Sequence, residues 1–267
     1  LIIIGIIMIF TGFTTDAGVA AFSNMWNYGG WFPNGTMGFI LSFQMVVFAF
    51  TGIELVGLTA GETEDPEKVI PMAINNIPLR IILFYVGSLA IIMSIYPWTA
   101  VNPSASPFVA VFTAVGIAAA AGIVNFVVLT SAASATNSGI FSTGRMIYAL
   151  AKRGHAPSSM RRLTHSSVPY QATIFSAAVL LITVVLNYVM PEAVFVMITS
   201  ISTFCFIFIW AMMVICHLKY RKKNPELAAQ SKFKMPLYPV MNYVILGFFV
   251  FVLAILALNE DTRIALL

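Results

Sequence analysis

The segment FAFTGIELVG, from Phe48 to Gly57, places one carboxylate and two glycines inside a long apolar stretch. A carboxylate at the bilayer centre costs about 2.5–3.5 kcal/mol on insertion scales, so it usually faces a protein interior or a water cavity and has a function. Glycine within a helix costs about 1 kcal/mol relative to alanine and allows the backbone to unwind. Gly52 and Glu54 together therefore predict an interrupted membrane helix that holds a polar solute.

Two structural alternatives stay open for this segment. A neutral Glu54 can hydrogen-bond to a neighbouring helix and act only as a link between helices. Gly52 can simply allow close packing of one helix against another.

The composition around this segment is that of an integral membrane protein. Hydrophobic residues make up 60% of the 267 residues, charged residues only 9%, and the mean hydropathy is +0.92. A soluble domain has about 25% charged residues. Barrel strands would alternate in short segments, so the long apolar runs predict an all-α, multi-helix membrane bundle in a single domain. The expected spans are 1–10 (partial), 38–60, 77–98, 118–150, 168–190, 193–218 and 235–258.

The first of these spans, LIIIGIIMIF, has ten residues, whereas a helix needs about 20 to cross the hydrocarbon core. We therefore expect the chain to begin partway through a membrane helix. With that partial helix included, the chain is expected to cross the membrane about seven times.

The basic residues lie in alternate connections between the apolar runs. This pattern is typical of membrane topology and not of a nucleic-acid-binding face, although the sequence pI is about 9.1. The connections with basic residues are expected to be cytoplasmic, and the opposite side carries Arg263 alone. The expected cytoplasmic set comprises Lys68, Arg80, Arg145, Lys152, Arg153, Arg161, Arg162, Lys219, Arg221, Lys222, Lys223, Lys232 and Lys234.

The run 125–154 is unusually polar for a membrane helix. Serines recur at spacings of three and four, so they form a narrow stripe with Asn137 beside it. The stripe predicts a cavity wall that offers hydroxyls and an amide to a polar solute; tight packing through Ala135 and Gly139 is the structural alternative. The serines are Ser131, Ser134, Ser138 and Ser142.

No pattern in the chain predicts an enzyme, a metal site or a bound cofactor. The three histidines do not pair with cysteine or acidic residues at metal-ligand spacing. Nucleophile-elbow, zinc-protease, Walker and dinucleotide motifs in a suitable context are absent from the sequence. Cys205 and Cys216 would lie roughly 16 Å apart along one helix, too far for a disulfide.

Three segments carry a resemblance to a known family. FAFTGIELVGLTAGETEDPEKVIPMAINNIPLRI, beginning at Phe48, resembles the amino acid permeases of the amino acid–polyamine–organocation superfamily. NFVVLTSAASATNSGIFSTGRMIYALAKRGHAP, beginning at Asn125, is similar to the eighth helix of that family. FKMPLYPVMNY and LNEDTRIALL resemble the eleventh helix and the segment after it. Among the members, the likeness points to those that carry glycine, D-alanine and D-serine.

The resemblance implies a leucine-transporter-like fold of twelve helices, ten of which form two inverted repeats of five. This chain would begin late in helix five and end before helix twelve. It would then contain the second repeat, with helices one to four and helix twelve in the rest of the same protein. The implied location is the bacterial cytoplasmic (inner) membrane, and the implied partners are membrane lipid and a small neutral amino acid, without nucleic acid.

The resemblance also assigns roles to residues at the break. Phe48 would form an aromatic lid over the substrate. The carbonyls of Phe48, Ala49 and Thr51, freed by the break at Gly52, would receive the substrate ammonium group. Glu54 would act in proton coupling or gating, since a low-dielectric environment favours the neutral carboxylic acid. The cavity wall on the eighth helix would add Ser134, Asn137 and Ser138.

The expected function is import of small neutral amino acids by proton symport with alternating access, with the proton as coupling ion and no other cofactor. A sodium-coupled transporter of the same fold is an alternative, in which Ser134 and Ser138 would coordinate the ion. A channel would need an open polar lining or a ring of charges. A truncated, non-transporting membrane module is the remaining alternative.

Overall fold

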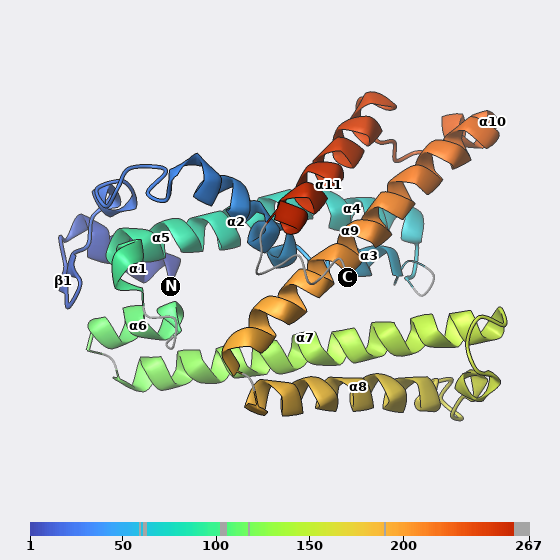
Figure 1. Cartoon of the computed structure of the whole chain (residues 1–267), viewed down its shortest axis with the longest axis horizontal. Helices are drawn as coiled ribbons and strands as arrows, with labels where there is room; N and C mark the ends of the chain where they lie inside the picture. The colour runs from blue at the N-terminus through green and yellow to red at the C-terminus, as the bar shows by residue number, and fades with distance from the viewer. Residues whose placement is uncertain (59, 61–62, 102–105, 117, 190, 259–267) are drawn as a thin grey trace. The chain divides into compact units, whose positions relative to one another are not determined.

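The computed structural model describes residues 1–58, 60, 63–101, 106–116, 118–189 and 191–258. Most of these residues are helical, as predicted (Figure 1). The chain divides into two compact units, which are described in turn: the first comprises Leu1–Asn34 and Ala73–Ala178, and the second comprises Gly35–Met72 and Val179–Leu267. Some expectations fall outside the described residues. They concern Arg263, the tail LNEDTRIALL from residue 259 onward, and the ends of spans 38–60 and 168–190, at residues 59 and 190.

The first unit begins with α1 (Ile2–Phe10) and a short antiparallel strand pair, β1 (Thr14–Thr15) and β2 (Gly18–Val19). The strand pair departs from the all-α expectation. A side-chain hydrogen bond from Thr15 Oγ1 to the Gly18 carbonyl, 3.0 Å long, closes its two-residue turn. Gly18 has a φ of +122°, which is open to glycine and strained for other residues.

A single 30-residue helix starts at Pro66 and ends at Ile95. It consists of α4 (Pro66–Arg80), the π-helical segment η3 (Ile81–Val86) and α5 (Gly87–Ile95). The helix therefore starts earlier than the expected span 77–98. Proline is favoured at the first position of a helix, because its fixed φ suits the helix and its missing N–H has no helical partner there. Pro66 thus begins this helix.

The core of the first unit forms where α1 and α5 pack together. Its buried residues are Met8, Ala20, Ile91, Ile92, Ile95 and Val111. The 3-10 helix η1 (Phe22–Met25) is tied to this core by Asn24, whose Nδ2 donates to the carbonyls of Val19 and Ser94 at 2.9 and 2.8 Å. The segment that follows α1 is therefore ordered by packing.

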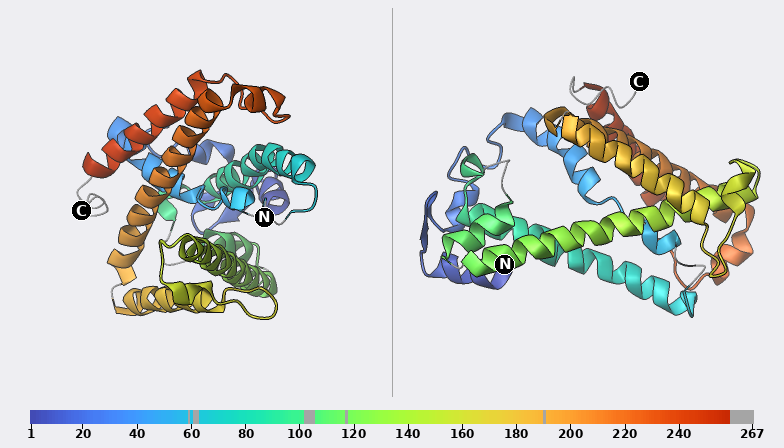
Figure 2. Two further views of the ribbon diagram at one scale, coloured as in Figure 1. Left: turned by 90° about the vertical axis from the view of Figure 1, so that its right-hand side faces the viewer. Right: turned by 90° about the horizontal axis from the view of Figure 1, so that it is seen from below.

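The rest of the first unit contains η4 (Trp98–Ala100), α6 (Pro107–Ala114), α7 (Ala118–Lys152), η5 (Ser158–Arg161) and the first part of α8 (Tyr170–Val189). The start of α8, up to Ala178, runs beside α7 (Figures 1 and 2). A Cβ atom placed on Gly144 would lie 2.9 Å from Thr173 Oγ1 and 3.2 Å from Thr173 Cα, whereas one on Gly139 would meet open space. Small-residue packing thus occurs at Gly144, and Gly139 does not take part in it within the described structure.

The second unit contains α2 (Gly35–Ala49), α3 (Leu55–Leu58), the start of α4, the end of α8, α9 (Pro191–Lys223), α10 (Pro225–Gln230) and α11 (Val240–Leu258). Helices α2, α9 and α11 pack against one another. Their shared core holds Val47, Ile207, Phe249 and Val252.

A buried hydrogen bond joins two of these helices beside the core. Gln44 of α2 donates through Nε2 to Ser200 Oγ of α9 at 2.9 Å, and both side chains are buried. Because a buried polar group without a partner is costly, this bond fixes how α2 meets α9.

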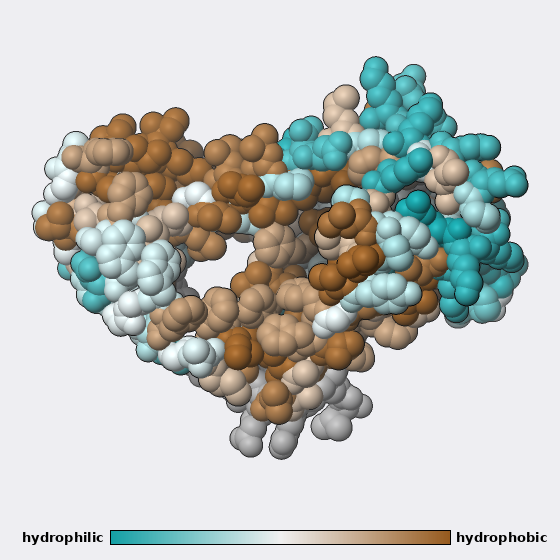
Figure 3. Space-filling view, turned by 90° about the horizontal axis from the view of Figure 1, so that it is seen from above, coloured by the Kyte–Doolittle hydropathy of each residue, from teal (hydrophilic) through white to brown (hydrophobic). Residues whose placement is uncertain are grey.

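Five described helices are long and apolar enough to cross a bilayer. The helix α2 is apolar but shorter than these. Apolar side chains cover much of the face drawn in Figure 3, as expected for surfaces in contact with lipid. The chain is therefore part of an integral membrane protein. The five helices are Pro66–Ile95, Gly122–Lys152, Tyr170–Val189, Met197–Lys223 and Val240–Leu258.

We predict that Gly144→Val lowers the thermal stability of the purified protein, whereas Gly139→Ala on the same helix does not. The valine side chain collides with the backbone of Thr173, whose hydroxyl is also held by the Pro169 carbonyl at 3.0 Å. Overpacking of this kind typically costs about 1–3 kcal/mol. Melting temperatures in detergent measure the difference, and equal values for the two variants would show that α8 does not pack at Gly144.

Candidate functional site

The helix that carries Glu54 is interrupted. Helix α2 ends at Ala49, α3 begins at Leu55, and the residues between them form a turn. Gly52 has a φ of +102° in this turn, a conformation that residues with a Cβ adopt only under strain. The interruption predicted at Gly52 is confirmed.

The Glu54 carboxylate closes this break. The Gly52 N–H donates to both carboxylate oxygens, with nitrogen–oxygen distances of 3.1 Å to each. A broken helix leaves backbone donors without helical partners, and an anionic acceptor is a strong partner for them. Glu54 therefore satisfies the backbone at the place where its own helix is interrupted.

A second hydrogen bond joins Glu54 to helix α9. The indole Nε1–H of Trp210 donates to Glu54 Oε2 at 3.3 Å. The Trp210 ring packs between Phe206 and Phe249, with ring centroids 5.9 and 6.2 Å away. The carboxylate thus connects the break to the aromatic core of α9 and α11. This contact is compatible with both interpretations of Glu54, as a helix link and as a coupling group.

The substrate residues predicted on α2 and the turn lie together at the break. Phe48 and Thr51 are half-buried, and Ala49 is exposed. The Phe48 carbonyl accepts from the Thr51 N–H at 3.1 Å and from Thr51 Oγ1 at 2.8 Å. A carbonyl oxygen has two lone pairs, and both are used here. The expectation that the break frees the Phe48 carbonyl is therefore not met in this structure. In the described structure Thr51 therefore occupies the carbonyl at which the ammonium group was expected to bind.

The predicted residues on α7 belong to the first unit. Ser134, Asn137 and Ser138 are exposed. Ser138 Oγ donates to the Ser134 carbonyl at 3.0 Å, a bond within the helix itself. Their part in a substrate site stays a prediction.

Sequence reasoning missed three residues of the second unit that shape the surroundings of the break. Trp210 was hidden within the apolar run 193–218, and the signal was its N–H, which needs a partner when the ring is buried. Gln44 and Ser200 were polar residues within expected spans, the same signal that drew attention to Glu54. On α9, Thr199 and Thr203 are also buried, with 2% and 0% of their surface exposed.

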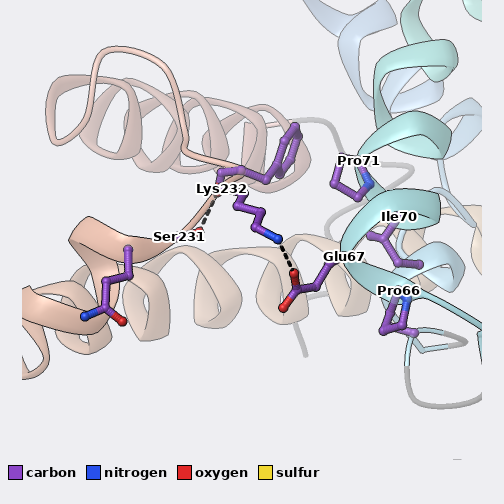
Figure 4. A pocket seen from close by; sticks show the side chains of 9 residues that line it. Pro66, Glu67, Ile70, Pro71, Ser231 and Lys232 are labelled. Atoms are coloured by element: carbon purple, nitrogen blue, oxygen red, sulfur yellow. Dashed lines mark hydrogen bonds and ion pairs between the residues drawn. The ribbon is translucent and has the colours of Figure 1, made fainter.

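A separate pocket of about 430 Å³ lies at the start of α4 (Figure 4). Pro66, Glu67 and Ile70 line it on one side, and Lys232 and Phe233 line it on the other. Lys232 Nζ donates to Glu67 Oε2 at 2.7 Å, and this hydrogen bond raises the pKa of Lys232. Both side chains are largely exposed, so the ion pair adds little stability.

Cys205 and Cys216 are free thiols, as predicted. Among the described residues, His, Cys, Asp and Glu side chains form no group that could hold a metal ion.

Comparison with known proteins places the sequence of this chain in a family. The family model for amino acid permeases matches residues 1–265. The chain is 67% identical to an uncharacterized transporter (YdgF) and 64% identical to an amino-acid permease (AapA), both of Bacillus subtilis strain 168. It is 52% identical to a D-serine/D-alanine/glycine transporter of Escherichia coli O6:H1.

Each match covers the whole chain but only 57–58% of the relative, so the chain spans less than two thirds of the length of these proteins. No solved structure matches the chain significantly. The chain belongs to the amino acid permease family, whose members are transporters and not enzymes.

Proposed function

We propose that this chain forms the larger part of a secondary active transporter that imports small neutral amino acids of the glycine, D-alanine and D-serine class. The support is the permease family and the specificity named for a relative that is 52% identical. The observation that carries the proposal is the interrupted helix, whose Gly52 N–H is held by a carboxylate within a membrane-embedded unit. Interrupted helices with exposed backbone groups are how many secondary transporters hold charged substrates.

The proposed binding site uses the backbone at the break. The substrate ammonium group would bind the carbonyls of Phe48, Ala49 and Thr51, and the Phe48 ring would cover it. Because Thr51 donates twice to the Phe48 carbonyl, substrate binding exchanges these two bonds for bonds from the ammonium group. Ser134, Asn137 and Ser138 of α7 would supply hydroxyls and an amide at the cavity wall.

The proposed coupling ion is the proton, and Glu54 is the proposed carrier. When it is ionised, the Glu54 carboxylate can accept all three of its contacts, two from the Gly52 N–H and one from Trp210. A protonated carboxyl group has one oxygen that acts as a donor, so it cannot keep all three bonds unchanged. Proton uptake would therefore loosen the break or its attachment to α9, which links protonation to alternating access.

The proposed architecture is the second repeat of a five-plus-five inverted-repeat fold, completed by helices one to four and helix twelve elsewhere in the same protein. The proposed location is the bacterial cytoplasmic membrane, with the basic connections on the cytoplasmic side. The charge pattern supports this orientation, because basic loops are retained on the cytoplasmic side.

We predict that Glu54→Gln in the full-length protein abolishes pH-dependent accumulation of D-alanine and leaves exchange of labelled for unlabelled substrate. Glutamine keeps the shape and an acceptor oxygen but does not titrate. Uptake of radiolabelled D-alanine into proteoliposomes, with and without a pH gradient, measures this effect. Glu64→Gln, in the exposed loop before α4, is the matched control and should behave as wild type.

Unchanged proton-driven accumulation by Glu54→Gln would refute the coupling role. Accumulation that requires a sodium gradient and ignores pH would instead support the sodium-coupled alternative.

We predict that Gly52→Ala reduces D-alanine uptake about tenfold or more at equal protein abundance, whereas Gly57→Ala has little effect. A φ of +102° is strained for alanine and costs about 1–3 kcal/mol. Gly57 lies in α3 with ordinary backbone angles and open space around its Cβ position. Uptake rates normalised to transporter content measure the contrast. Wild-type uptake by Gly52→Ala would mean that transport does not depend on this backbone conformation.

A further inference from the structure

A strongly basic surface lies at and beyond the end of α9 in the second unit. The chain from His217 to Met235 has six Lys or Arg residues and one acidic residue, Glu226. Three of the basic residues, Arg221, Lys222 and Lys223, form the last turn of α9. Basic clusters at the end of a membrane helix attract anionic lipid headgroups, with each Lys or Arg contributing to the attraction.

Part of this surface is hollowed into a pocket of about 130 Å³, called here the basic interfacial pocket. It is bounded by the end of α9, by α10 and by the segment that leads to α11. Its lining includes His217, Tyr220, Arg221, Phe233 and Lys234. The pocket is therefore built from two cations and an imidazole and has no carboxylate in its lining.

The two cations of the pocket are available to an anion. Lys232, the neighbouring base, is already paired with Glu67 (Figure 4). No carboxylate in the described part of the chain forms an ion pair with Arg221 or Lys234. The Arg221 guanidinium lies 3.9 Å above the centre of the Tyr238 ring, a cation–π contact that holds the side chain while leaving its N–H groups to other acceptors.

The His217 imidazole is held in place by a contact with α11. Asn242, fully buried near the start of α11, has its Nδ2 3.0 Å from His217 Nδ1. When the amide donates to Nδ1, the neutral ring carries its proton on Nε2 and offers a further donor. The His217 ring also meets the edge of the Tyr238 ring, with centroids 5.6 Å apart.

Exposed aromatic and apolar side chains occur in the pocket lining, at Tyr220, and on the chain that continues from the pocket into α11, at Leu237 and Val240. Tyr220 is 51% exposed, Leu237 is 72% exposed and Val240 is 63% exposed. They lie where two membrane-length helices, α9 and α11, meet the polar segment between them. A ligand for this place should have a negative headgroup for the pocket and acyl chains for the apolar surroundings. A free phosphate ion would satisfy only the first requirement.

We propose that the basic interfacial pocket binds the headgroup phosphate of an anionic phospholipid, with phosphatidylglycerol as the test ligand. Arg221 and Lys234 would contact the phosphate, and Tyr220, Leu237 and Val240 would contact the acyl chains. The proposal requires only that α9 and α11 cross the membrane, so it is independent of the substrate and the coupling ion.

The test is native mass spectrometry of the full-length protein titrated with phosphatidylglycerol or phosphatidylcholine. We predict tighter binding of phosphatidylglycerol and about a tenfold loss of that affinity in the double variant Arg221→Gln/Lys234→Gln. The double variant Lys222→Gln/Lys223→Gln removes the same charge from residues outside the pocket lining and should lose less than twofold. Because Arg221 also packs on Tyr238, its replacement can disturb the fold. The single variant Lys234→Gln changes only an exposed side chain, so a partial loss of affinity in this variant is not explained by misfolding.

Equal losses in the two double variants would overturn the pocket in favour of diffuse attraction to the basic surface. Displacement of phosphatidylglycerol by millimolar inorganic phosphate would overturn the lipid as ligand, because the site would then recognise the anion alone. The proposal would also be refuted if both Lys234→Gln and Arg221→Gln/Lys234→Gln bound phosphatidylglycerol with wild-type affinity.

Discussion

The interrupted helix depends on one constraint: a backbone N–H inside a membrane must have a partner. Water in the bilayer core is too scarce to supply one, so an unpaired group costs several kcal/mol. In this chain the Glu54 carboxylate supplies the partner for Gly52 from two residues further along. The acid that sequence reasoning marked as a functional group is therefore also what makes the local fold tenable.

The packing of the second unit places this break beside the core shared by three helices. Helices α2, α9 and α11 share an apolar core, and the bond between Gln44 and Ser200 fixes α2 on α9. Trp210 extends the contact to Glu54. A change in the protonation of Glu54 would thus act at the contact between the turn and α9, which is where we propose that coupling takes place.

Sequence reasoning found the break because glycine and a buried acid have strong and separate energetic signatures in a membrane. It found the free thiols from helix geometry alone. It did not find Trp210, because aromatic residues are common in apolar runs and the position of a hydrogen-bond partner depends on tertiary packing. The helix start at Pro66 was missed because proline can either begin or break a helix. The occupied carbonyl of Phe48 was missed because it depends on the rotamer of Thr51. The α7 serines illustrate the same limit: their spacing defined a stripe but not what that stripe faces.

Hydrogen–deuterium exchange across Phe48–Leu58 tests most directly whether the break is the place where substrate binds. In the full-length protein in lipid nanodiscs, the amides of this segment should exchange faster than those of α11, and D-alanine should slow them without changing the exchange of 170–178. A substrate site at the break would be contradicted if, without substrate, the amides of Phe48–Leu58 exchanged as slowly as those of α11. It would also be contradicted if a D-alanine concentration that saturates binding did not slow their exchange.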